Sequence, residues 1–338
     1  MRLTIYAFTA AWLVAALLPS SALAQGARAS SPPEFARKID ELKPGEWVWS
    51  PQVAPDGPVL VYVDLSRQIA MVYRNGLRIA ATTVSTGKDG YETPTGVFTI
   101  LQKDANHHSS LYNNAPMPFQ ERLTWDGVAL HAGGLPGFPE SHGCVHLPYE
   151  FSRELFAITS LGMTVVIEGD AIQTVETTAN SLLAPYNARG EPTASPGLLD
   201  GEQFRWNPGL ESEGPLSIIV SKLDQRIVVL RNGTEIGRSA ALIDDPDPGS
   251  HVITLITRDG APHWIYVAVT GHPEDEGREI DGSILNRVRL PREFYNGLIG
   301  ELRPGTTILV TNSRVEAEGA PQITVMDAIS PTTDFPVH

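Results

Sequence analysis

The chain has 338 residues, of which 42% are hydrophobic and 19% charged, and its formal net charge is -14. Such an acidic chain has no general electrostatic attraction to nucleic acid or to anionic lipid, so neither is expected as a partner. Its length is too great for one small core and predicts about two domains.

The N-terminus has the pattern of a secretory signal peptide. Arg2 precedes an apolar run at residues 5–18, and the small residues Ala-Leu-Ala follow at 22–24. Residues 1–24 are therefore expected to be removed on export. The apolar run is shorter than the roughly 20 residues that a spanning helix needs, so we expect no transmembrane anchor after cleavage. These features predict a periplasmic protein in an oxidising compartment.

Two pairs of stretches resemble each other and predict a duplicated unit. Residues 49–76 read WSPQVAPDGPVLVYVDLSRQIAMVYRNG, and residues 206–233 read WNPGLESEGPLSIIVSKLDQRIVVLRNG. Each predicts two β-strands and an Asn-Gly turn. Residues 145–170 and 288–313 are also similar, and each predicts a short helix opened by Pro and ended by Gly, followed by an apolar strand.

The repeats predict two tandem, mainly β domains of the β-rich α+β class, each a β-sandwich or mixed sheet with one short helix. The domains are expected at residues 44–170 and 201–315. Residues 171–200 are rich in Thr, Ser, Pro and Gly and predict a linker. Residues 25–43 and 316–338 look like poorly ordered ends.

The single cysteine, Cys144, lies in the stretch PESHGCVHLP at residues 139–148. In an exported protein an unpaired thiol is either a buried filler or a reactive group. A predicted strand at 128–130 ends in His131, and the Gly- and Pro-rich loop after it is long enough to bring Cys144 beside that imidazole. An imidazole that takes the thiol proton creates a nucleophile. Gly143 would let a substrate carbonyl approach the backbone amides.

Two other interpretations of these residues stay open. His142, Cys144 and His146 would project to one face of an extended segment. With His131 they would form a His3Cys metal site. Alternatively, the thiol is inert and buried, and the histidines are satisfied in the core.

Two motifs together resemble the L,D-transpeptidase catalytic domain, often called the YkuD domain. Residues 131–148, HAGGLPGFPESHGCVHLP, resemble its signature, and residues 85–100, STGKDGYETPTGVFTI, resemble the segment that usually precedes it. The resemblance covers about residues 58–170. It implies a cysteine acyltransferase that attacks the third residue of a peptidoglycan tetrapeptide stem, releases D-alanine and passes the acyl group to an amine.

The resemblance implies the reacting pair. Cys144 would be the nucleophile and His131 its general base. A backbone carbonyl would have to orient the His131 imidazole, because Ala132 follows where many members have a residue that helps to hold it. A thiolate beside His131 needs neither a metal nor an organic cofactor, and we expect none.

The resemblance also implies roles for the residues around the thiol. Ser141 and His142 would hold the pocket and position the substrate. The backbone amides of Gly143 and Cys144 would stabilise the oxyanion. His146 stands where many members have Arg or Asn, so a protonated or donor imidazole would have to replace that contact with the substrate carboxylate.

The segment between the motifs, residues 107–125, contains Tyr112, Met117 and Phe119. It is expected to be either a lid or groove over the thiol or an ordinary connecting loop. His107 and His108 at its start are expected to be solvated loop residues.

The acyl acceptor stays open. An amine of another stem would give a 3-3 cross-link, and a cell-wall protein or lipoprotein would give an attachment. Water as acceptor would make the protein an L,D-carboxypeptidase or endopeptidase. A non-catalytic wall-binding protein is the alternative from a different class.

The second copy lacks the catalytic residues. When the two repeats are aligned, Thr270 corresponds to His131 and Arg287 corresponds to Cys144. Leu285 corresponds to His142. We therefore expect a degenerate, non-catalytic unit that either binds glycan or a partner, or buttresses the first unit.

Overall fold

The structure is a computed structural model of the whole chain, and it describes most of both predicted domains. The described residues are 26–110, 113–169, 171, 197–199, 201–267, 269, 272, 275–281, 284, 287–315 and 328–329. The predicted signal peptide, nearly all of the predicted linker and most of the C-terminal tail lie outside them. In this part of the chain no helix is both long and apolar enough to cross a membrane.

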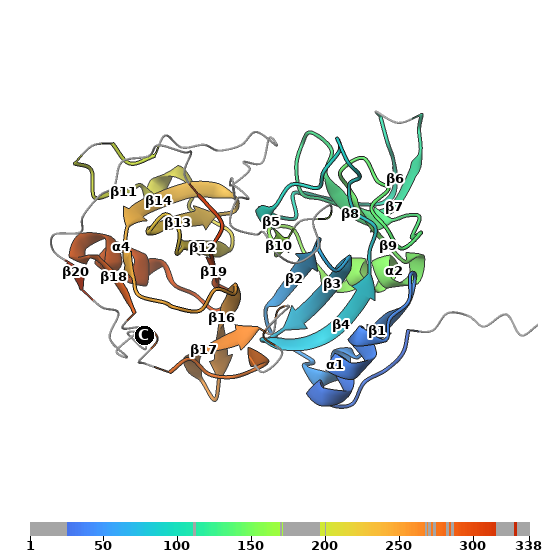
Figure 1. Cartoon of the computed structure of the whole chain (residues 1–338), viewed down its shortest axis with the longest axis horizontal. Helices are drawn as coiled ribbons and strands as arrows, with labels where there is room; N and C mark the ends of the chain where they lie inside the picture. Colours follow the sequence, from blue (N-terminus) through green and yellow to red (C-terminus); the bar gives the residue numbers. More distant parts are fainter. Residues whose placement is uncertain are drawn as a thin grey trace, which may run out of the picture.

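The first half of the chain is built on a six-stranded sheet in the order β1-β4-β3-β2-β10-β5 (Figure 1). Its strands are β1 (Trp47–Trp49), β2 (Val59–Asp64), β3 (Ile69–Arg74), β4 (Leu77–Thr83), β5 (Gly96–Thr99) and β10 (Thr164–Glu168). β2, β3 and β4 form an antiparallel meander, and β10 returns parallel to β2. Asn75 and Gly76 both have positive φ between β3 and β4, as the tight hairpin turn requires.

A smaller sheet and a helix cover one face of this sheet. The four-stranded sheet has the order β6-β7-β8-β9. Its elements and the helix are β6 (Gln102–His108), β7 (Pro116–Arg122), β8 (Ala129–Ala132), β9 (Val145–Leu147) and α2 (Tyr149–Ile158). Phe151 and Leu155, one helical turn apart, are buried in the core beneath them. β8 and β9 run parallel, so His131 lies opposite His146.

The second half is built on a seven-stranded sheet in the order β11-β14-β13-β12-β19-β16-β17. Its strands are β11 (Phe204–Trp206), β12 (Leu216–Ser221), β13 (Arg226–Arg231), β14 (Thr234–Ala240), β16 (His251–Arg258), β17 (Ala261–Val267) and β19 (Thr307–Thr311). Beside it lie β15 (Leu242–Ile243), β18 (Val288–Pro291), β20 (Ala328–Ile329) and α4 (Arg292–Glu301), and the 3₁₀ turns η1 (Pro51–Val53) and η3 (Pro208–Leu210) precede β2 and β12.

The two large sheets repeat one topology. Six strands of the second sheet follow the strand order of the first. The second sheet has the order β11, β14, β13, β12, β19, β16, and the first has β1, β4, β3, β2, β10, β5. β19 is parallel to β12 as β10 is parallel to β2, and both meanders carry a bulge at the same place. Trp49 stands edge-on to Phe151 at 5.3 Å, and Trp206 stands edge-on to Phe294 at the same distance.

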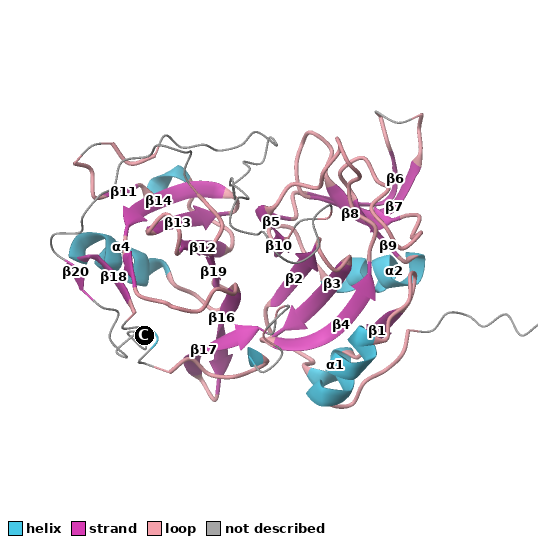
Figure 2. Ribbon diagram, in the orientation of Figure 1, coloured by secondary structure: helices cyan, strands magenta, loops and turns pink. Residues whose placement is uncertain are grey.

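The two halves lie side by side (Figure 2), and their large sheets contribute equivalent faces to one buried cluster. Equivalent positions of the two copies both belong to this cluster. The pairs include Tyr62 and Ile219, Met71 and Val228, Tyr73 and Leu230, and Val166 and Leu309. Burial of this face from both sides removes a large apolar area from water, so the halves stabilise each other. The opposite face of the first sheet is left to carry α2 and the small sheet.

The N-terminal segment was predicted to be poorly ordered, and for its described residues this is wrong. A helix, α1 (Pro32–Asp40), follows Ser31, and Phe35 and Ile39 on one of its faces are 1% and 3% exposed in the shared core. Just before it, the amide of Ala29 donates to Ser50 Oγ at 2.7 Å. Two apolar residues four positions apart are enough to anchor such a short helix when a sheet face is ready to receive them.

Candidate active site

The two motifs of the first half are joined by backbone hydrogen bonds. Ser85 donates to the carbonyl of His146 at 3.2 Å and accepts from its amide at 2.9 Å. Ser141 donates to the carbonyl of Thr86 at 3.0 Å and accepts from the amide of Lys88 at 3.1 Å. The segment that begins the first motif therefore runs alongside the loop that carries the thiol and fixes its course.

A cavity of about 870 Å³ opens where these segments meet. All six site residues predicted from the sequence line it: His131, Ser141, His142, Gly143, Cys144 and His146. The wall on the other side comes from β7 and from the residues that precede β8, including Gln120, Arg122, Trp125 and Asp126. The structure thus gathers around one cavity a set of groups that spans about 25 residues of sequence.

His131 is held in β8 as a neutral imidazole with a defined tautomer. It is 5% exposed, and burial lowers its pKa to about 4, with a further contribution from His146. Its Nδ1 lies 2.9 Å from the backbone carbonyl of Ala132, which can only accept a hydrogen bond. Nδ1 therefore carries the proton, and Nε2 keeps a free lone pair. A backbone carbonyl was expected to orient the His131 imidazole, and the carbonyl of Ala132 is placed to do so. This tautomer is suited to a general base.

Cys144 is a neutral thiol in this resting state. Its Sγ donates to the carbonyl of Gly127 at 3.3 Å. Burial raises the pKa of the thiol to about 11, although the Ala129 amide and the Arg122 guanidinium oppose the shift. The sequence led us to expect a thiolate beside His131, and the structure differs because both groups are desolvated. Proton transfer to His131 then has to accompany attack instead of preceding it.

Ser141 fixes the backbone of the loop before the thiol. Its hydroxyl donates to the carbonyl of Cys144 at 2.5 Å and accepts from the amide of Gly143 at 3.2 Å. Gly143 has φ of 107°, a conformation that favours glycine. Thr93 from the first motif donates to the carbonyl of Gly143 at 3.0 Å. Because Ser141 already uses the Gly143 amide, this amide can serve an oxyanion only after the hydroxyl releases it.

His142 lies at the solvent side of the cavity. Its Nε2 is 3.3 Å from the ammonium of Lys88, and the ring of Tyr91 stands edge-on to it at 4.7 Å. Lys88 and Tyr91 both come from the first motif. The position suits contact with a substrate as it enters.

His146 lines the cavity beside His131. Its ring lies 4.8 Å from that of His131, and its Nδ1 is 3.2 Å from the carbonyl of Gly134. Burial lowers the pKa of His146, although the Gly134 carbonyl and Glu140 at 3.8 Å oppose the shift. The ring packs closely on Gly133, where a Cβ would come within 2.5 Å of it. Contact between His146 and the substrate stays a prediction.

Two polar residues of β7 were missed in the sequence. Gln120 is 1% exposed, lines the cavity, and its amide oxygen and nitrogen have no hydrogen-bond partner among the described residues. Arg122 also lines the cavity and is held by Gln102 at 2.9 Å. Gln120 and Arg122 are two positions apart in one strand, so their side chains lie on the same face of the sheet. This spacing is the feature of the sequence that could have predicted them as site residues.

From this segment, β7 pairs antiparallel with β6 (Figure 1), and residues of both strands line the cavity. Met117 is buried and lines the cavity, and Phe119 packs on residues of α2. Tyr112 lies outside the described residues. His107 was expected to be a solvated loop residue, but it lies in β6, lines the cavity and contacts Asp104 at 3.3 Å.

The alternative of a metal at the thiol has no geometric support. Within the described parts of the chain, the one group of three or more potential ligand atoms that converge lies elsewhere and does not include Cys144. In the second half, Arg287 stands at the position equivalent to the thiol and pairs with Asp245 at 3.1 Å. Thr270 and Leu285 lie outside the described residues, so the non-catalytic nature of the second unit stays a prediction.

Comparisons with known proteins are consistent with this site. Residues 58–167 match the model of the L,D-transpeptidase catalytic domain, YkuD. No curated protein matches the chain.

Solved L,D-transpeptidase structures match part of the chain. The enzyme from Mycobacterium smegmatis is 22% identical with a TM-score of 0.31, the one from Stackebrandtia nassauensis 28% with 0.32, and one from Mycobacterium tuberculosis 21% with 0.32. The matches cover 33%, 42% and 33% of this chain and 59%, 68% and 58% of theirs, so the chain spans under two thirds of the Mycobacterium smegmatis structure. The stretch that the family model matches, residues 58–167, contains all six site residues predicted from the sequence.

Proposed function

We propose that the protein is a periplasmic L,D-transpeptidase that uses Cys144 to transfer acyl groups between peptidoglycan stem peptides. The observation that carries the proposal is the placement of Cys144 and of the oriented base His131 on one cavity, within a segment that matches the family model. The predicted signal peptide supports export, and the cavity is wide enough for a peptide.

In the first half-reaction the Cys144 sulfur attacks the carbonyl carbon of the third stem residue, and its proton moves to Nε2 of His131. The carbonyl oxygen becomes an oxyanion near the amides of the Gly143–Cys144 segment. When the carbon–nitrogen bond breaks, the imidazolium returns the proton to the departing amine of D-alanine. The product is a thioester on Cys144, and His131 is neutral again.

In the second half-reaction an acceptor amine attacks the thioester. His131 takes a proton from the amine, and the protonated base then returns the thiol to its resting state. The low pKa of His131 and the high pKa of Cys144 both favour the neutral pair at the start and at the end of this cycle. No charge is therefore stranded in the buried site between turnovers.

The residues of β7 are suited to the substrate's polar groups. Gln120 presents an unsatisfied amide to the cavity, and Arg122 presents the cation that His146 does not supply. A stem peptide has both amides and a terminal carboxylate, so these two groups match its chemistry. We propose that Arg122 takes the carboxylate contact that the family assigns to the position of His146.

The test is mass spectrometry of a purified disaccharide-tetrapeptide incubated with the mature protein or with its Cys144→Ala variant. Loss of D-alanine together with a cross-linked dimer, absent with the variant, is the expected result. Loss of D-alanine alone would show that water is the acceptor and that the protein is an L,D-carboxypeptidase. Turnover retained by Cys144→Ala would refute the thioester mechanism.

A further inference from the structure

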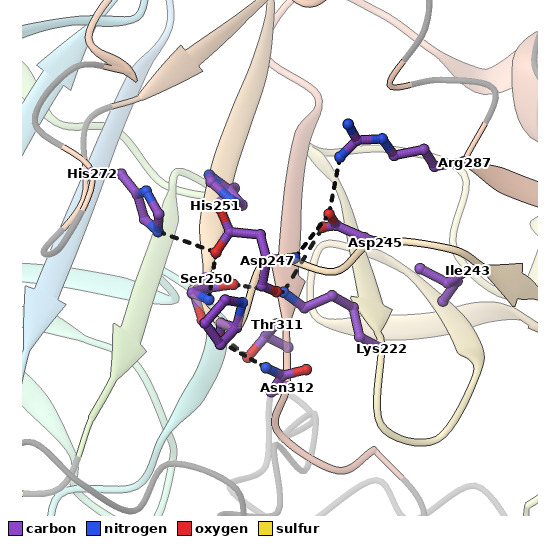
Figure 3. Close-up of polar contacts among 12 residues, drawn as sticks. Lys222, Ile243, Asp245, Asp247, Ser250, His251, His272, Arg287, Thr311 and Asn312 are labelled. Atoms are coloured by element: carbon purple, nitrogen blue, oxygen red, sulfur yellow. Dashed lines mark hydrogen bonds and ion pairs between the residues drawn. The ribbon is translucent and has the colours of Figure 1, made fainter.

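Three side chains with metal-binding groups converge in the second half of the molecule (Figure 3). Asp247 lies in the loop before β16, His251 is the first residue of β16, and His272 comes from the segment after β17. One ligand atom of each lies within 4.8 Å of those of the other two. β16 takes the place in its sheet that β5 has in the first half, so this cluster lies where the first copy places the segment that runs alongside its catalytic loop.

The ligand atoms are close enough for one metal ion to contact all three side chains. Asp247 Oδ2 is 3.3 Å from His251 Nε2, and Asp247 Oδ1 is 3.7 Å from His272 Nε2. With zinc–ligand bonds of about 2.0–2.1 Å, tetrahedral ligand atoms lie roughly 3.3 Å apart. The rings of His251 and His272 lie 4.3 Å apart at an interplanar angle of 38°, and the Asp247 carboxylate contacts both imidazoles (Figure 3).

His251 has the second hydrogen bond that ligating histidines usually show. Its Nδ1 is 2.8 Å from Oδ2 of Asp275, whose side chain is 1% exposed and is also paired with Arg278. A carboxylate on Nδ1 fixes the proton there and directs the lone pair of Nε2 toward Asp247 and His272. A cluster formed only by chance on the surface would not need this buried support.

The loop that carries Asp247 is held rigidly. Lys222 donates to the backbone carbonyls of Asp247 and Gly249, and the amide of Gly249 donates to Asp247 Oδ1 at 2.7 Å. The charge of Lys222 is offset by Asp245 at 3.8 Å. At Gly249 a Cβ would lie 2.0 Å from His272 Nε2, so only glycine lets the loop come this close to the imidazole.

We propose that Asp247, His251 and His272 bind a zinc ion, with water as the fourth ligand. Two neutral imidazoles and one carboxylate form a ligand set that zinc favours among divalent ions. Without metal, Asp247 contacts both imidazoles directly. A bound zinc ion would join His272 to the start of β16.

The site would help to dock the second unit on the first. Glu276, next to the supporting Asp275, accepts a hydrogen bond from the amide of Arg78 at 3.0 Å and lies 3.8 Å from its guanidinium. Both side chains are 6% exposed, and Arg78 belongs to β4 of the first sheet. The amide of Asp275 donates to the carbonyl of His272 at 3.2 Å, so an ion held by His272 is coupled to this contact between the halves.

The test is zinc titration of the tag-free mature protein after dialysis against a chelator, followed by calorimetry, with cobalt as a spectroscopic substitute. We expect one zinc per chain, a higher Tm with zinc, and a tetrahedral cobalt spectrum without sulfur-to-metal absorbance. His272→Ala and Asp247→Asn should lose stoichiometric binding. Asp275→Asn should weaken binding about 10- to 100-fold, as losses of such supporting groups do.

Two matched controls locate the ion. His263→Ala removes another histidine of the second half, which pairs with Glu279, and Cys144→Ala removes the thiol of the catalytic cavity. Both should still bind one zinc. Absence of zinc binding in the wild-type protein overturns the proposal, and so does loss of the ion in Cys144→Ala or sulfur-to-metal absorbance with cobalt. If the ligand variants fail to fold, the wild-type stoichiometry and the cobalt spectrum still decide.

Discussion

Glu168, the last residue of β10, accepts a hydrogen bond at 3.1 Å from the hydroxyl of Thr311, the last residue of β19. These two residues occupy equivalent positions in the two copies. Residues of both large sheets also form one buried cluster, so the two halves stabilise each other.

The buried carboxyl of Glu168 predicts that stability falls as pH rises toward neutrality. Burial raises its pKa to about 7 from the ordinary value of 4.5, so the folded state holds the proton more tightly than the unfolded chain. Its favourable contribution is complete below about pH 4.5 and is lost as pH rises through about 7. In urea unfolding from pH 4 to 8, the free energy of unfolding of Glu168→Gln should change less with pH than that of the wild type. The difference should be on the order of 1 to 3 kcal/mol. The exposed Glu213→Gln should keep the wild-type profile, and an unchanged slope in Glu168→Gln would contradict the assignment.

The shared core predicts that the two halves unfold together. Leu309 of β19 is 1% exposed and packs in this core, so Leu309→Ala should cost about 2–5 kcal/mol. Thermal unfolding should show one transition that moves to lower temperature, and Cys144 should become accessible to alkylation in the same transition. Leu210→Ala, at a residue that is 65% exposed, should have little effect. Two separate transitions would mean that each half folds alone.

The neutral thiol–imidazole pair predicts a broad pH range of activity. His131, with a pKa of about 4, is an unprotonated base above that value, and Cys144, with a pKa of about 11, keeps its proton below that value. Turnover should be lost as pH falls through about 4, and alkylation of the free enzyme by iodoacetamide should accelerate up to about pH 11. A midpoint for alkylation near neutrality would instead indicate a preformed thiolate. Slow labelling at pH 7 is therefore not a sign of an inactive protein, and substrate turnover has to distinguish an enzyme from a wall-binding module.

The unpaired amide of Gln120 predicts a role in substrate binding. Gln120→Leu removes no internal hydrogen bond among the described residues, so Tm should be unchanged or higher. A lost hydrogen bond to the stem should raise KM about 5- to 10-fold, since such bonds contribute about 1 kcal/mol. Steady-state kinetics of D-alanine release would measure it, with the exposed Gln52→Leu as control. An unchanged KM with a lower Tm would show that Gln120 is structural.

Much of the site could be predicted from the sequence because its signals are local. The Gly-containing loop between His131 and Cys144, and the spacing of Ser141 and Gly143, are read from one short stretch. The hairpin turn at Asn75 and Gly76 is equally local, since positive φ at two successive positions selects these residue types. The duplicated unit was visible because its strands keep their order and their turns.

Other features depend on contacts between residues far apart in the chain, and the sequence predicted them wrongly or not at all. The helix with Phe35 and Ile39 was taken for a poorly ordered end, because its partner surface comes from sheets far along the chain. Gln120 and His107 belong to the cavity only because β6 and β7 fold over the thiol. His272 lies over 20 residues after Asp247, with no ligand motif between them, so the zinc cluster has no signature in the sequence.

The sequence by itself determined which groups this protein has for chemistry: one thiol, an imidazole ahead of a Gly- and Pro-rich loop, and a second copy with Thr270 and Arg287 at the corresponding positions. The tertiary structure decided what state those groups are in. Burial of Cys144 and His131 sets a neutral pair, because desolvation of a charged group depends on every element packed around it. It also decided that the two copies share one core, because only in three dimensions do the equivalent apolar faces meet.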